Sequence, residues 1–552
     1  MRPPRNRAKV KSGCRTCKTR RVKCDEGWPA CSRCLSTGRV CEGYGIWGGG
    51  GNEYGRRSMG PTTSRSLKAF HSPALIETLN KEESQCLEWF TYRSALKLPG
   101  AFRSEFWDTL VFQAASNEPA VFHAILALSS AHRREGLYGC ALTIHDVPDK
   151  PEQFTLRHYS RAISHLRPHF SDKSNSSVRV ALITCLMFIM MEFLRGNYKS
   201  GMTHLQNGMK VLNGCQARSN SIDKYSLFLG PCCDSADAWI IQAFIRLDVQ
   251  AKLLGHGQQH LNIIQEDCAS EVVVPELTFE SPNQARQYLD RIFSQIFYLS
   301  HECCRIARCG HGEYPNTMLL KQIRIKAKLD SWHQAFNSSH ANLLSTKPST
   351  NTVAHPLLLV YYTVAQIMVD TCISPADELR YDAHTASFEY ILNQLKYIRK
   401  LSQNPEISKV IHFSDMSSSV SDLGALPGLY YVAVKCRDHR IRHNAVQTLN
   451  ALLHKEGAWN APLIACVTEE IVRIEEGSFY EGSNVAGTEL PTLPESYRLH
   501  DVEMELPEDY AGTVTLNCKR KLDGHNWEVI SRQSVYDIGT QRWVYKAGDD
   551  QY

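Results

Sequence analysis

Apolar residues recur at helical spacing through most of this chain of 552 residues. From residue 85 to about residue 480 they stand three or four positions apart, which is the period of a helix with one buried face. After Pro119, for example, apolar side chains occupy positions 121, 122, 125, 126 and 128. Further helices are predicted over residues 178–194, 239–254, 284–301, 318–336, 355–370, 384–401, 429–436 and 441–454. The pattern indicates a mainly all-α protein.

One predicted helix, residues 178–194, is apolar on nearly every side. A membrane span would need about 20 apolar residues, whereas Arg179 and Glu192 bracket only 12 here. We therefore expect a buried core helix and no membrane partner. The serines at 174, 176 and 177 supply hydroxyl groups that could cap its first turn.

The helical pattern is absent from both ends of the chain. Residues 48–51 are four consecutive glycines within a stretch rich in Gly, Ser and Arg, which is typical of a flexible linker. Near the other end, residues 513–518 and 527–531 alternate β-prone side chains around Asp523-Gly524, which predicts a short β-hairpin. We expect five parts: a basic tail (1–11), a cysteine-rich module (12–45), a linker (46–84), a helical body (85–480) and a C-terminal segment (481–552).

Residues 501–510 mix acidic with apolar side chains. Such mixing can form an activation segment. A solvated connection is the favoured interpretation of this stretch.

Positive charge is concentrated at the start of the chain. Residues 1–45 hold 12 Lys and Arg against 3 Asp and Glu, while the other 507 residues hold 50 against 54. A concentrated basic patch favours a phosphate-binding surface. The alternatives are a solvated charged face or a localisation signal. The first 11 residues lack the apolar core of a secretory signal, and the remaining cysteines are scattered, so we expect a reduced, intracellular protein.

Six cysteines lie at regular spacing within the basic module, with the pattern C-x2-C-x6-C-x6-C-x2-C-x6-C: Cys14, Cys17, Cys24, Cys31, Cys34 and Cys41. Each C-x2-C pair places two thiolates on one turn, which suits tetrahedral zinc. Six thiolates cannot fill two separate four-ligand sites, but they can do so if two sulfurs are shared. The spacing therefore predicts a binuclear cluster of two zinc ions with two bridging cysteines.

This stretch resembles the fungal binuclear zinc cluster family of transcription factors, including a proline at position 29 before the fourth cysteine. The resemblance implies that Cys14 and Cys31 bridge the two ions. One ion would then bind Cys14, Cys17, Cys24 and Cys31, and the other Cys14, Cys31, Cys34 and Cys41. Residues 105–133, 180–212, 243–254 and 429–459 are similar to the helical regulatory domain that follows such clusters.

Between Cys17 and Cys24, four of the six residues are cationic, and we expect them on one short helix. Family members place this helix in the major groove of DNA, where an arginine can bond two acceptors of guanine. The resemblance implies that Arg21 reads a CGG-type triplet, with Arg20 beside it. Other basic residues are better placed to contact phosphates: Lys18, Lys23, Arg15, Lys9 and Lys11.

The sequence thus predicts a nuclear, sequence-specific DNA-binding protein that regulates RNA polymerase II transcription and contacts the transcription machinery or co-regulators. Because the linker has no sustained heptad pattern, monomeric and homodimeric binding stay open. Two alternatives remain: a zinc-dependent protein-interaction module, and an enzyme whose zinc cluster is purely structural. We expect no enzyme, because the chain lacks G-x-S-x-G, H-E-x-x-H and Walker motifs.

Overall fold

The structure is a computed structural model of the chain. It describes residues 17, 20–25, 31–37, 79–138, 148–171, 174–219, 236–255, 277–308, 316–339, 343, 351–404, 419–481, 490–508, 512–522, 526–537 and 542–545. The predicted linker lies outside these residues except at its end, where helix α4 (Lys81–Trp89) begins. Asn80 and Glu83 start this helix by capping each other's backbone N–H groups.

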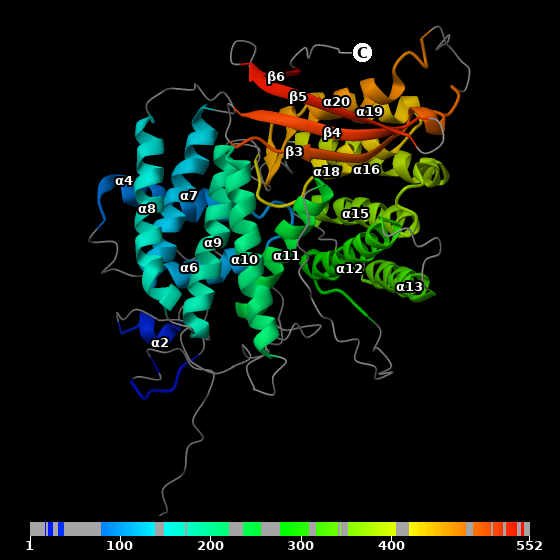
Figure 1. Cartoon of the computed structure of the whole chain (residues 1–552). Coiled ribbons are helices and arrows are strands. Elements are labelled where there is room, and N and C mark those ends of the chain that lie inside the picture. The colour runs from blue at the N-terminus through cyan, green and yellow to red at the C-terminus, as the bar shows by residue number, and fades with distance from the viewer. Residues whose placement is uncertain are drawn as a thin grey trace, which may run out of the picture.

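Helices form most of the body, as the apolar spacing predicts (Figure 1). After α4 they are η1 (Phe90–Ser94), α5 (Ala95–Lys97), η2 (Phe106–Leu110), α6 (Val111–Ala115), α7 (Pro119–Tyr138), α8 (Lys150–Ser171), α9 (Asn175–Arg195), α10 (Tyr198–Ser219), α11 (Ala236–Leu253), α12 (Pro282–Arg308), α13 (Asn316–Ser338), α15 (Asn351–Thr371), η3 (Glu378–His384), α16 (Thr385–Gln403), α18 (Leu426–Lys435), α19 (His439–Asn450), α20 (Ala461–Glu476) and η4 (Glu495–Tyr497). Neither α8 nor α20 is among the helices expected from the sequence.

Helix α9 is the apolar helix expected over residues 178–194, and it lies in the core. The Ser174 hydroxyl accepts the Ser177 N–H at 3.3 Å and caps its start, and Gly196, with φ of 83°, ends it. Helices α7, α8, α10 and α11 pack around it. Two stretches, Asn175–Arg195 and Thr352–Thr371, are long and apolar enough to span a membrane, but 78% and 72% of their apolar windows are buried inside the protein.

A short hairpin, β1 (Lys455–Glu456) and β2 (Trp459–Asn460), joins the N-terminal helices to the later ones. The buried Lys455 ammonium donates to the Leu194 carbonyl at the end of α9, 2.7 Å away. On the other side, the Glu456 carboxylate accepts three N–H groups at the start of α18, from residues 424–426, at 2.8–3.0 Å. Both charges are buried and both are paired, as burial requires.

The C-terminal segment forms an antiparallel sheet in the order β3 (Leu499–Glu505), β4 (Thr513–Lys521), β5 (Trp527–Asp537) and β6 (Arg542–Tyr545). The predicted hairpin is its central pair, with Cys518 opposite Ile530. In β4, every second side chain is buried, including Val514 and Leu516. In Figure 1 this sheet lies over α18, α19 and α20.

The interpretation of residues 501–510 as a solvated connection is wrong for residues 501–505, which belong to β3. Leu499 and Met504 are buried on this strand, and Glu503 pairs with Asn517 of β4. A register shift between His500 and Glu503 interrupts the simple alternation. The strand is therefore hard to recognise from its sequence.

Two glycines of α10 provide a matched test of helix packing. A Cβ on Gly208 would lie 2.3 Å from the buried Phe244 ring of α11, whereas a Cβ on Gly214 would meet nothing within 4 Å. We expect Gly208→Ala to lower the free energy of unfolding by about 1–3 kcal/mol through overpacking. Gly214→Ala should instead raise it by up to about 1 kcal/mol, because alanine favours the helix. Denaturant titration measures both, and equal effects would contradict this packing.

Candidate zinc and DNA-binding site

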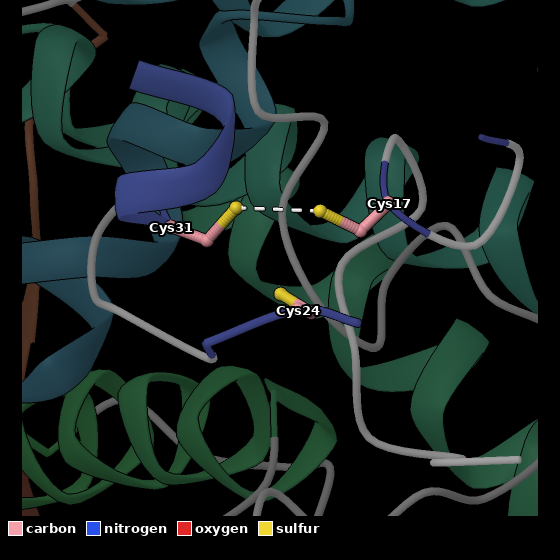
Figure 2. Close-up of side chains that lie close together, drawn as sticks. All are labelled: Cys17, Cys24 and Cys31. Atoms are coloured by element: carbon pink, nitrogen blue, oxygen red, sulfur yellow. Dashed lines mark hydrogen bonds between the residues drawn. The ribbon is translucent and has the colours of Figure 1, made fainter. Parts of the chain in front are cut away.

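Four of the six predicted zinc ligands lie in the described residues, and the fold gathers them. Cys17, Cys24, Cys31 and Cys34 are all buried, at 5% exposure or less. The Cys17 sulfur lies 3.6 Å from that of Cys31 and 3.8 Å from that of Cys34. Figure 2 shows Cys17, Cys24 and Cys31 turning their sulfurs toward a common centre. Cys14 and Cys41 lie outside the described residues.

These distances fit zinc. Two thiolates on one tetrahedral zinc ion, each bonded at about 2.3 Å, are separated by about 3.8 Å. The ligand atoms of Cys17, Cys24 and Cys31 all lie within 4.8 Å of one another. The contact of Cys17 with both Cys31 and Cys34 brings the two halves of the motif into one sulfur cluster.

Helix α2 (Ser32–Leu35) holds the second half of the motif in place. The Cys31 sulfur caps it by accepting the Cys34 N–H at 3.3 Å. The Asp25 carboxylate accepts the N–H groups of Ser32 and Arg33 at 2.9 and 3.1 Å. Desolvation acts to raise the pKa of Asp25, but these N–H groups and the Ser32 hydroxyl stabilise its charged form and lower the pKa to about 2. The residue after Cys24 thus fixes the helix that carries Cys34.

The basic segment between Cys17 and Cys24 makes a turn at Arg21. This residue has φ of 55°, in the left-handed region, and the Val22 N–H donates to the Cys17 carbonyl at 3.0 Å. That bond closes the end of a helical turn. The prediction of one helix across residues 18–23 is therefore wrong from Arg21 onward. The chain has to reverse there to return Cys24 to the sulfur cluster.

The structure describes three of the predicted DNA contacts. Arg21 and Lys23 are exposed, while Arg20 is half-buried and donates to the Thr37 hydroxyl at 3.2 Å. Arg20 therefore links the two halves of the module. The remaining predicted contacts lie outside the described residues: Lys9, Lys11, Arg15 and Lys18.

The helical body contains a separate cavity of about 240 Å³. It lies among η2, α11, α12 and residues 421–422, and Trp107, Trp239 and several amide side chains line it. The guanidinium of Arg246 at its wall donates to the Asp422 carboxylate and to the Phe102 carbonyl, both at 3.0 Å. The residues that line the cavity include no histidine or cysteine.

A further group of possible metal ligands was missed in the sequence. His439, His443 and Glu476 come together from α19 and α20. The spacing of the two histidines, four residues apart, was a readable signal, since such a pair lies on one face of a helix. The carboxylate could not be found this way, because it is more than 30 residues away on a helix that the sequence did not predict.

A buried cluster of thiols with an exposed basic turn, in a chain with a large helical body, defines a zinc-cluster DNA-binding protein. Comparison with protein families agrees. Residues 12–46 match the fungal Zn(2)-Cys(6) binuclear cluster domain, and residues 91–461 match the fungal specific transcription factor domain. The second match covers more than half of the chain, which therefore belongs to the fungal transcription factors that carry a Zn(2)-Cys(6) cluster.

Known relatives are transcription regulators. The aspercryptin biosynthesis cluster-specific transcription regulator atnN of Emericella nidulans is 22% identical, over 86% of this chain and 89% of its own length. Transcription regulator lscL of Purpureocillium lilacinum is 23% identical, over 66% and 88%. Transcriptional regulatory protein moc3 of Schizosaccharomyces pombe is 50% identical over 42 residues, 8% of each chain. No solved structure matches significantly. The protein is a DNA-binding transcription factor and not an enzyme.

The contacts of Asp25 generate a prediction about zinc affinity. Removing its carboxylate frees the start of α2 and loosens Cys31 and Cys34, so Asp25→Ala should weaken zinc binding about 10–100-fold, as loss of outer-shell partners does. Ser36→Ala, at the exposed end of the same helix, should leave the affinity unchanged. Competition with a chromophoric chelator measures both variants. If Asp25→Ala binds zinc as tightly as Ser36→Ala, the role assigned to the carboxylate is wrong.

Proposed function

We propose that this transcription factor is zinc-dependent, reads a CGG-type triplet in the major groove through Arg21, and acts in the nucleus on RNA polymerase II transcription. One observation carries the proposal: an exposed arginine occupies a left-handed backbone position beside the sulfur cluster. Glycine or asparagine suits such a position better, and other residues cost about 1–2 kcal/mol there. The backbone cost of an arginine at this position is accounted for if its side chain contacts DNA.

The turn also sets the direction of the side chains around it. Arg20 donates to Thr37 and is held against the module, whereas Arg21 and Lys23 are exposed to solvent. We assign base recognition to Arg21 and phosphate contact to Lys23. Phosphate contacts position a protein on DNA without specifying sequence.

The remaining basic residues of the module support the same role. With 12 cationic residues against 3 acidic ones in residues 1–45, this module supplies the positive charge for the phosphate backbone. The rest of the chain holds 50 Lys and Arg against 54 Asp and Glu, so it has no excess positive charge for binding DNA. We therefore assign the helical body to contacts with co-regulators or the transcription machinery. Whether one chain or two bind is left to the experiment below.

Base recognition by Arg21 can be separated from its structural role. Arg21→Gly suits the left-handed backbone, so the cluster should keep its zinc and the protein should fold. It should nevertheless lose about 1–3 kcal/mol of preference for a CGG-type site over a scrambled site. Competition gel shifts measure this preference, and their mobility reports how many chains bind. Full discrimination by a zinc-loaded Arg21→Gly protein would refute the assignment.

Lys23→Ala is the matched control for phosphate contact. It should weaken binding to both DNA sites equally and reduce the slope of log affinity against log salt by about 1. Fluorescence anisotropy over a range of salt concentrations measures the slope. A loss of sequence preference in Lys23→Ala would reverse the two assignments.

Zinc content tests the bridged cluster. We infer two ions bound by residues 14–41, with Cys14 and Cys31 shared between them. Cys31→Ala should then disturb both ions, whereas Cys41→Ala should disturb mainly one, because Cys41 would bind only the second ion. Elemental analysis of residues 1–60 measures the zinc content of the wild type and both variants. A single ion in the wild type would contradict the bridged cluster.

A further inference from the structure

Two histidines and one glutamate form a compact group on the helical body, far along the chain from the cysteine module. His439 and His443 lie one turn apart on α19, and Glu476 is the last residue of α20. One carboxylate oxygen of Glu476, Oε2, lies 3.0 Å from His439 Nδ1 and 3.1 Å from His443 Nε2. All three ligand atoms lie within 4.8 Å of one another.

The distances suit a divalent metal ion. With bonds of about 2.0–2.1 Å to nitrogen and oxygen, ligand atoms at a right angle around the ion are about 2.9 Å apart, and at a tetrahedral angle about 3.4 Å apart. The separations of 3.0 and 3.1 Å lie between these values. Two histidines and one carboxylate, with the fourth position open to water, are a common zinc ligand set.

Neighbouring residues orient two of the three ligands. Arg442, which is buried, lies 3.4 Å from the other carboxylate oxygen of Glu476, so that Oε2 faces the two imidazoles. Tyr480 packs its ring 4.5 Å from that of His439. Side chains that hold the ligands in this way raise the affinity of metal sites.

Charge and access also favour a cation. The second guanidinium contact of Arg442 goes to the buried Glu475 carboxylate, which also accepts from Arg437 at 2.9 Å. The positive charges of Arg442 and Arg437 are therefore neutralised by neighbouring carboxylates. The His443 side chain is 44% exposed, which leaves a route for the ion and for a bound water molecule.

We propose that His439, His443 and Glu476 bind a zinc ion, separate from the ions of the cysteine cluster. The ion links the first two turns of α19 to the end of α20. Glu475, the neighbour of Glu476, accepts the Leu499 N–H of β3 at 2.9 Å. Zinc at this place therefore stabilises the region where the C-terminal sheet meets the helical body.

Zinc content of the full chain tests the site. After equilibrium dialysis against Zn²⁺ and elemental analysis, the wild type should hold one more ion per chain than His443→Ala. His443 is half-exposed, so this variant should fold, which circular dichroism checks. His301→Ala is the matched control, because it removes a similarly exposed histidine beside a glutamate on α12. It should retain the additional ion.

Two further measurements separate this site from the cysteines. Co²⁺ added to protein that holds zinc only at the cysteine cluster, after the additional ion has been removed by dialysis against a weak chelator, should give visible ligand-field bands without a thiolate-to-cobalt charge-transfer band, and Glu476→Gln should weaken these bands. Zn²⁺ should also raise the melting temperature of the wild type, because it binds the folded state, and this rise should be absent from His443→Ala. Equal zinc content in the wild type and His443→Ala would overturn the proposal and leave only hydrogen bonds between these side chains.

Discussion

Helix α9 can be stable in water only if other helices cover all of its sides. Its residues from Val180 to Leu194 are apolar almost without interruption, and nearly all are buried. Burial of such side chains contributes about 1.5–3 kcal/mol each. Packing of α7, α8, α10 and α11 around this helix satisfies that requirement. The end of α9 then presents the Leu194 carbonyl to Lys455, which ties the later half of the body to the first.

The cysteine module depends on a different interaction. Its described residues bury four thiols but few large apolar side chains, so metal–sulfur bonds replace a hydrophobic core, as in other small zinc modules. The left-handed backbone at Arg21 persists because Cys17 and Cys24 must both reach the cluster. The constraint that binds zinc therefore also exposes the basic side chain that we assign to DNA.

Local signals in the sequence were reliable. Ser174 was predicted to cap a helix and does so. The strands on either side of Asp523-Gly524 pair as the predicted hairpin requires. Both signals act over a few residues. Predictions failed where distant partners decide the conformation. Residues 501–505 form a strand because β4 lies beside them. Helix α20, in contrast, does carry a local start signal, the Asn460 cap followed by Pro462, and this signal went unrecognised.

For the candidate sites, the sequence by itself determined the class of protein and the basic segment and predicted the zinc ligands, because these lie within 28 residues at a regular spacing. Only the tertiary structure decided which polar and charged side chains contact each other. Arg246 pairs with Asp422, and Glu476 reaches two histidines of α19, across separations that no local pattern encodes. These contacts follow from how whole helices pack, and packing depends on the apolar faces of every helix at once.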